Sequence, residues 1–166
     1  MKPTPTGRLV STPDGTDLVL TRTFRAPIDD VWASITEPER TARWFGPWRG
    51  EAAPGRTISV QMSYEDQAPW CDLRIDTCRP PHHLAVSMDD EAGTWRMELR
   101  LTESGGTTEL SLVHHLTTDD SIGQIGPGWE YYLDMLTAAR NAAPLPDFDD
   151  YYPAQKPHYD AQRARA

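Results

Sequence analysis

The residue with the clearest capacity for chemistry is His114, in the segment Leu-Val-His-His-Leu. It stands where the alternation of Leu110, Leu112 and Leu116 predicts an inward apolar side chain. An imidazole can donate or accept a proton near neutral pH. His114 is therefore the candidate catalytic residue, and the alternative is a buried histidine satisfied by a backbone or tyrosine partner.

The neighbouring residue types do not predict a metal centre or a cofactor. His115 should point to the opposite face of a regular strand from His114, so the pair cannot bind one metal ion. Cys71 and Cys78 are seven residues apart, which fits neither a secreted disulfide framework nor a four-ligand metal cluster. No nucleophile elbow and no phosphate-binding glycine loop is present. We therefore expect no metal and no cofactor.

The remaining candidates are mostly apolar or aromatic side chains that would bind a ligand. They share the inward face of predicted strands or one face of the last predicted helix: Met62, Tyr64, Cys71, Trp95, Met97, Leu112, His114, Trp129, Tyr132 and Leu133. Such a set, apolar with a few polar tips, is typical of small-molecule sites. For each residue taken singly the alternative is ordinary core packing, and the two tyrosine hydroxyls could instead reach water.

The elements that must position these residues follow from periodicity. Period-two patterns predict strands at 8–11, 18–24, 58–62, 73–77, 84–88, 95–101 and 110–116. Helical spacing and proline positions predict two short helices, one from Pro27 to about Ile35 and one from Pro38, and a final helix at about 127–142. In the second strand Arg22 interrupts the apolar face and is expected near its wet end. This order predicts an α+β fold with helices on one face of an antiparallel sheet.

The segment of residues 22–47 resembles the SRPBCC superfamily, in the branch named after the activator of the heat-shock protein ninety ATPase. The residues that carry the resemblance are Ala26-Pro27, Val31-Trp32, Pro38-Glu39 and Trp44-Phe45, and later Gly128-Trp129 with Leu133 and Leu136. The resemblance covers roughly residues 8–143. It implies a helix-grip fold, in which a sheet of about seven strands wraps a long C-terminal helix and encloses a cavity for hydrophobic ligands.

The resemblance also suggests how the chain is divided. We expect a helix-grip domain at 8–143, followed by a Pro- and Tyr-rich arm at 144–166. The eukaryotic activator has an additional N-terminal domain, which has no counterpart here, so the branch name does not by itself predict a chaperone function.

Charge and hydropathy restrict the partners. The formal net charge of −9 repels nucleic-acid phosphates and anionic lipid surfaces. No stretch has the length of a membrane span, and the first residues lack the apolar core of a signal peptide, so a cytoplasmic location is expected. The expected partner is a small hydrophobic molecule, with a homodimer as a further option.

Three functions fit these observations. The first is binding of a small hydrophobic molecule between the sheet and the last helix. The second is an enzyme resembling a polyketide cyclase, in which His114 and a tyrosine move a proton. The third is a protein-interaction role, such as a chaperone accessory.

Overall fold

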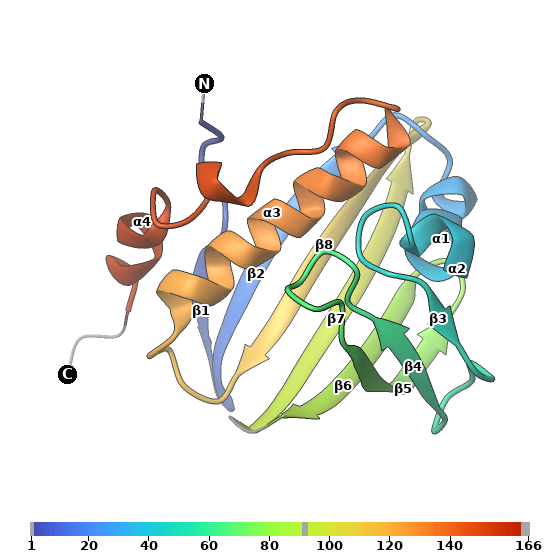
Figure 1. The fold of residues 1–166 in the computed structure, drawn as a ribbon, viewed down its shortest axis with the longest axis horizontal. Coiled ribbons are helices and arrows are strands. Elements are labelled where there is room, and N and C mark those ends of the chain that lie inside the picture. Colours follow the sequence, from blue (N-terminus) through green and yellow to red (C-terminus); the bar gives the residue numbers. More distant parts are fainter. Residues whose placement is uncertain (1, 91–92, 164–166) are drawn as a thin grey trace.

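One curved antiparallel sheet with a long helix lying across it dominates the computed structural model, which describes residues 2–90 and 93–163 (Figure 1). The strands are β1 (Arg8–Thr12), β2 (Gly15–Phe24), β3 (Trp48–Arg49), β4 (Thr57–Gln61), β5 (Trp70–Arg79), β6 (His83–Asp90), β7 (Gly93–Ser104) and β8 (Thr107–Leu116). The helices are α1 (Ile28–Thr36), α2 (Pro38–Thr41), α3 (Ile122–Arg140), the 3-10 helix η1 (Phe148–Asp150) and α4 (Lys156–Asp160). The strand order is β1-β2-β8-β7-β6-β5-β4-β3. The fold is therefore the expected α+β helix grip.

The sheet has eight strands where the sequence predicted about seven. The additional strand, β3, has two residues and pairs with Ser59 and Val60 of β4. A strand of this length is too short to show alternation. It follows Gly46, where a Cβ atom would lie 1.7 Å from the carbonyl oxygen of Gln61, so the chain passes too close to the end of β4 for any larger residue.

A β-bulge in β5 changes which side chains of that strand point inward. Ile75 pairs with Val86, and the next pair joins Thr77 to Ala85, so Asp76 is an extra residue in the ladder. Beyond the bulge Cys78 pairs with Leu84 and packs against a small apolar cluster of Ile58, Val60 and Ile75, where regular alternation from Leu73 would place Thr77. An inserted residue shifts the period-two pattern by one position, which alternation alone does not reveal.

Helix α3 begins at Ile122, five residues before the predicted start. The prediction relied on Pro127, which cannot donate a hydrogen bond to the preceding turn. Ile122 is fully buried, and its first turn is held by hydrogen bonds to the carbonyls of Asp119 and Ser121. Burial therefore outweighs the one backbone hydrogen bond that Pro127 lacks. None of the helices within the described part of the chain is long and apolar enough to cross a membrane.

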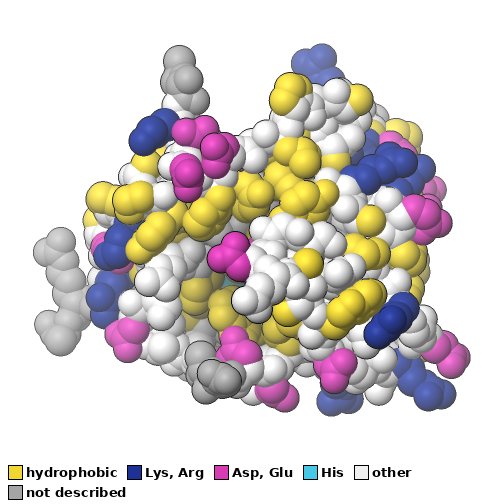
Figure 2. Space-filling model, viewed as in Figure 1, with side chains coloured by type: hydrophobic (Ala, Val, Ile, Leu, Met, Phe, Trp, Pro, Cys, Tyr) yellow, Lys and Arg dark blue, Asp and Glu magenta, His cyan; other side chains and the backbone are white. Residues whose placement is uncertain are grey.

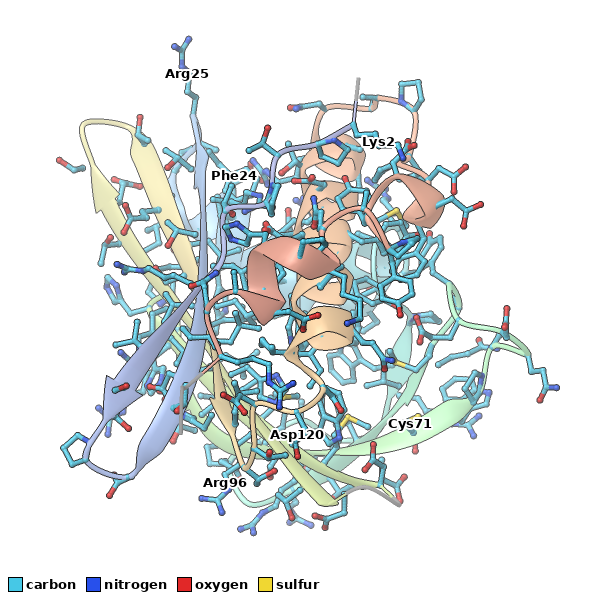
Figure 3. All side chains as sticks on the ribbon, turned by 90° about the vertical axis from the view of Figure 1, so that its left-hand side faces the viewer. Lys2, Phe24, Arg25, Cys71, Arg96 and Asp120 are labelled. Atoms are coloured by element: carbon cyan, nitrogen blue, oxygen red, sulfur yellow. The ribbon has the colours of Figure 1, made fainter. Side chains whose placement is uncertain are left out.

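The main core lies between α3 and the inner face of the sheet. Phe24 and Arg25 illustrate the alternation at the end of β2: Phe24 is buried, whereas Arg25 points away from the molecule (Figure 3). Residues that are no more than 3% exposed come mainly from β2, β7, β8, α1 and α3, and they include Leu18, Leu20, Val31, Leu101, Leu110, Leu112, Ile122, Leu133, Met135 and Leu136.

A buried ion pair joins α3 to β2. Glu130 has no exposed surface, and its Oε1 atom lies 2.9 Å from Nη2 of Arg22. Nε of Arg22 is 3.0 Å from Oδ1 of Asp134, one turn further along α3. The Arg22 side chain is only 14% exposed, so the expectation of a wet position is wrong: the acidic face of α3 covers it.

Glu130 also accepts hydrogen bonds from both terminal segments of the chain. The backbone N–H groups of Thr6 and Gly7 donate to Oε2, and the Tyr159 hydroxyl donates to the same oxygen at 2.6 Å. Burial by itself would raise the pKa of Glu130, but the hydrogen bonds from Tyr159 and Arg22 outweigh it and hold the pKa below its usual value. The carboxylate therefore stays ionised inside the protein.

The segment after α3 packs against that helix. Tyr159 of α4 is fully buried, with its ring over Gly126 and its hydroxyl beside Gly7. A Cβ atom on Gly126 would lie 2.6 Å from the Tyr159 ring. The described part of the expected arm, residues 144–163, is thus laid over the domain, and residues 164–166 lie outside the described residues. The division of the chain at residue 143 stays a prediction.

Gly126→Ala should therefore destabilise the protein by about 2 kcal/mol, because the new methyl group must displace the Tyr159 ring. Gly128→Ala in the same helix is the matched control, since a Cβ atom there meets nothing within 4 Å. Alanine favours helix more than glycine does, so this variant should be neutral or gain up to about 1 kcal/mol. Chemical denaturation measures both, and equal effects of the two substitutions would contradict the close packing of Tyr159.

Glu130→Gln should lower the free energy of unfolding by about 3 kcal/mol, because it leaves the buried Arg22 with Asp134 as its remaining carboxylate. Glu109→Gln, at an exposed position of β8, should change it by less than about 0.5 kcal/mol. Urea denaturation of the three proteins tests this. A Glu130→Gln loss no larger than that of the control would show that the buried pair adds nothing to stability.

Candidate functional site

Four ring side chains from three elements meet where α3 crosses β7 and β8. Trp95 of β7 lies against His114 of β8 in a tilted arrangement, with ring centroids 5.0 Å apart and planes at 30°. Trp129 of α3 meets His114 edge-on, at 6.2 Å and 86°, and Tyr132 lies 6.3 Å from Trp129. We call these four residues the aromatic cluster. Alternation along β7 and β8 points Trp95 and His114 toward α3, and the helical repeat points Trp129 and Tyr132 toward the sheet.

The sheet register explains the position of His114. In β8 it lies opposite Leu18 of β2 on one side and Met97 of β7 on the other, and both neighbours are buried. Directly opposed residues of antiparallel strands share a face, so His114 must point inward. Its side chain is accordingly 4% exposed.

A hydrogen bond from the helix determines which His114 nitrogen carries the proton. The indole Nε1–H of Trp129 donates to His114 Nδ1 at 3.1 Å, so Nδ1 is the acceptor and the proton resides on Nε2. Burial lowers the pKa of His114 to about 4, and the positive charge of His115 contributes to the decrease. The imidazole is therefore neutral at pH 7, with Nε2–H as its one donor.

Among the residues that the structure describes, this donor has no protein partner. Within residues 2–90 and 93–163, no hydrogen bond joins His114 Nε2 to another group. Among those same residues, Gln155 Oε1 is the one side-chain nitrogen or oxygen atom that is both fully buried and without a partner. Since His114 Nε2 also has no partner there, it cannot be fully buried and must be partly accessible. An almost buried N–H group that faces such space can donate to a molecule that enters it.

The open side of the cluster is formed by the loop of residues 62–69 between β4 and β5. The Tyr132 hydroxyl donates to Glu65 Oε2, and the Tyr64 hydroxyl donates to the carbonyl of Ala42 at 3.1 Å. Burial and then the hydrogen bond with the Glu65 carboxylate raise the pKa of Tyr132 far above its usual value, so its proton stays in place. The loop is therefore tied to α3 at one point and to the segment after α2 at another.

The cluster borders a hollow that opens to solvent. Figure 2 shows hydrophobic atoms on the floor of this hollow, between α3 and the 62–69 loop. Trp95 and Trp129 are half-buried, as are Met62 and Tyr64, and all four pack against the main core. Aromatic surface is thus accessible beside the unpaired N–H group of His114.

The structure brings some of the predicted site residues together and separates others. Trp95, His114, Trp129 and Tyr132 form the cluster, and Met62 and Tyr64 lie at its edge. Three predicted residues are core members no more than 6% exposed: Met97, Leu112 and Leu133. Cys71 lies on β5 opposite Val60 (Figure 3) and is not among the residues packed against the main core. Whether any of them contacts a ligand stays a prediction.

Two residues of this region were not among the sequence candidates. Met88 of β6 lies directly opposite Trp95 and packs against the same core, and the alternation of β6 could have identified it. Glu65 lies in an irregular loop, where no periodicity indicates its direction. Its hydrogen bond with Tyr132 depends on tertiary structure and leaves no local signal.

His115 belongs to a separate cluster on the opposite face of the sheet. Its Nδ1 lies 2.8 Å from Oδ1 of Asp17, and its Nε2 contacts Glu98, which also lies 2.7 Å from Nε2 of His83. Burial would lower the pKa of His115, but its hydrogen bonds with Glu98 and Asp17 outweigh it and raise the pKa. The described residues contain no group of three or more His, Cys, Asp or Glu placed to hold a metal ion.

His114→Gln should make stability less dependent on pH. The pKa of His114 is about 4 in the folded protein against an ordinary 6.5, so the unfolded chain binds the proton more tightly. The contribution of the neutral ring is complete above pH 6.5 and decreases as the pH falls toward 4. Between about pH 7 and 4.5 the wild type should lose about 2–3 kcal/mol more than His114→Gln, whose side chain does not titrate.

Chemical denaturation of both proteins at the two pH values measures this difference. The pKa of Glu98 is about 2, so this carboxylate stays ionised over the range, and His115 titrates in both proteins; the difference between the two proteins therefore reports mainly on His114. Parallel losses of stability in the two proteins would contradict a buried, neutral His114.

The chain is similar to one protein family and to several solved structures. The family described as Activator of Hsp90 ATPase homolog 1-like protein matches residues 25–140. CalU16 from Micromonospora echinospora is 26% identical over 96% of this chain and 96% of its own, with a TM-score of 0.76. No curated protein sequence matches the chain.

Two further solved structures share the fold alone. The protein encoded by BPP1335 of Bordetella parapertussis is 21% identical over 99% of this chain and 96% of its own, with a TM-score of 0.74. DynU16, from the dynemicin biosynthetic locus, is 20% identical over 82% of this chain and 50% of its own, with a TM-score of 0.68. Because the family match covers most of the sheet and all of α3, the chain belongs to the Activator of Hsp90 ATPase homolog 1-like family.

Proposed function

We propose that the protein binds a small, mainly apolar molecule that carries a hydrogen-bond acceptor, in the hollow beside the aromatic cluster. The observation that carries the proposal is the unpaired Nε2–H donor of His114 between two half-buried tryptophans. Apolar walls with a few placed polar groups are typical of small-molecule sites. A carbonyl or ether oxygen on the ligand would complete the hydrogen bonding of His114.

Charge indicates which molecules the site favours. Glu65 lies at the open edge, and the net charge of the chain is −9. A negative ligand would be repelled by both. The preferred ligand is therefore neutral, or positive on the side that faces Glu65.

The protonation of His114 favours binding over proton transfer. A ring with a pKa of about 4, whose Nδ1 already accepts from Trp129, is a weak base at pH 7 and has no second acceptor atom. The alternative functions, a cyclase-like enzyme and a chaperone accessory, stay predictions. DynU16, which shares the fold, comes from the dynemicin biosynthetic locus, so biosynthetic intermediates are the first molecules to screen.

A pair of probes tests the proposal. 1-Acetonaphthone and 1-isopropenylnaphthalene have nearly the same shape, because C=CH2 replaces C=O, but only the ketone has an oxygen that can accept a hydrogen bond. The ketone should bind about three- to tenfold more tightly, which corresponds to one hydrogen bond to a neutral donor. NMR titration that follows the indole N–H signals measures both dissociation constants.

Variants connect the preference to His114. His114→Phe keeps an aromatic ring but removes the donor, so it should bind both probes equally. His115→Gln, on the opposite face of the sheet, should keep the preference for the ketone. Failure of the wild type to bind either probe, or an unchanged preference in His114→Phe, would overturn the proposal.

A further inference from the structure

A second hollow, of about 220 Å³, lies where α1 and α2 meet the last turn of α3, away from the aromatic cluster. Three arginines line it: Arg40 at the end of α2, Arg43 just after it, and Arg140 at the end of α3. Figure 2 shows basic side chains grouped over this end of the molecule. Such a group is unexpected in a chain with a net charge of −9.

Arg140 is fixed in position by the elements around it. Its guanidinium donates to the Ser34 hydroxyl at 2.7 Å and to Oδ2 of Asp30 at 2.8 Å. It also lies over the Phe24 ring, 5.4 Å from the centroid. The side chain is 15% exposed, so one edge of the hollow is a preorganised positive charge.

The charges around the hollow do not balance. Asp30 is shared between Arg140 and Arg40, and Arg40 has a second, longer contact of 3.6 Å with Glu37. The guanidinium of Arg43, which is exposed, makes no hydrogen bond or ion pair within the described part of the chain. Three guanidinium groups thus face two carboxylates, and the excess positive charge belongs to Arg43.

Most of the surface that lines the hollow is polar, and Trp44 and Ala139 supply its apolar part. Trp44 is 7% exposed and Leu136 is fully buried, and both line the space together with Ala139. The indole N–H of Trp44 donates to the carbonyl of Ser34 at 2.9 Å, which fixes the ring. At roughly 30 Å³ for each water molecule, the hollow could hold about seven waters, which is more than a bare phosphate ion needs.

We propose that this hollow binds a small amphipathic anion, with a carboxylate or phosphate group between Arg43, Arg40 and Arg140 and a compact apolar body over Trp44. Guanidinium groups bind both oxyanions through paired N–H donors. The site is independent of the aromatic cluster, where Glu65 disfavours anions. The two proposals can therefore fail separately.

Three probes that share a phenyl ring test the charge requirement: phenyl phosphate, phenylacetate and benzyl alcohol. In NMR titrations up to about 20 mM, a range that detects millimolar dissociation constants, the two anions should shift the Trp44 indole N–H signal saturably. Benzyl alcohol should not. A stronger response to phenyl phosphate than to phenylacetate would identify phosphate as the preferred group, and the reverse would identify carboxylate.

Arg43→Ala should weaken binding of the anions about tenfold, because it removes one charge-assisted contact. Arg43→Lys should recover part of the affinity. Arg25→Ala is the matched control, because Arg25 is also exposed but points away from the molecule (Figure 3). The absence of a saturable shift in the wild type, or equal weakening by Arg43→Ala and Arg25→Ala, would overturn the proposal.

Discussion

Glu130 is a carboxylate without exposed surface in the middle of α3, and its partners come from the sheet, the N-terminal segment and the segment after α3. Arg22 reaches it from the sheet, Thr6 and Gly7 from the N-terminal segment, and Tyr159 from α4. A buried charge is tolerated only when its partners are in place. The same residue therefore requires the sheet, the long helix and both flanking segments to be assembled together.

This constraint also sets the rotation of α3 about its own axis. Glu130 must face β2, and Trp129 and Leu133 then follow from the helical period. Leu133 enters the core, and Trp129 turns toward β8, where its indole donates to His114. The geometry of the aromatic cluster is thus a consequence of an ion pair that has no contact with the proposed ligand. A rotation of the helix by even one side-chain position would separate Trp129 from His114 and leave two polar groups unpaired.

Periodicity and resemblance predicted the fold well because the strands and α3 bury continuous apolar faces. His114 and Trp129 were predicted to face each other for the same reason. What could not be predicted depends on tertiary contacts. The role of Arg22 follows from acids more than a hundred residues away, the early start of α3 from the burial of Ile122, and the position of Glu65 from an irregular loop. The hollow between α1, α2 and α3 is lined by residues from three separate helical segments, whose convergence no local pattern shows.

The adjacent imidazoles of His114 and His115 have their pKa values displaced in opposite directions, although one peptide unit separates them. The sheet separates a region of low polarity, where His114 lies, from a hydrated surface, where His115 lies. The separation is electrostatically incomplete, because the charges of His115 and Asp17 on the outer face both change the pKa of the buried His114 ring. Evolution could therefore tune the pKa of the interior imidazole by exchanging residues on the outer face, at Asp17 or His115, without altering any side chain in the aromatic cluster.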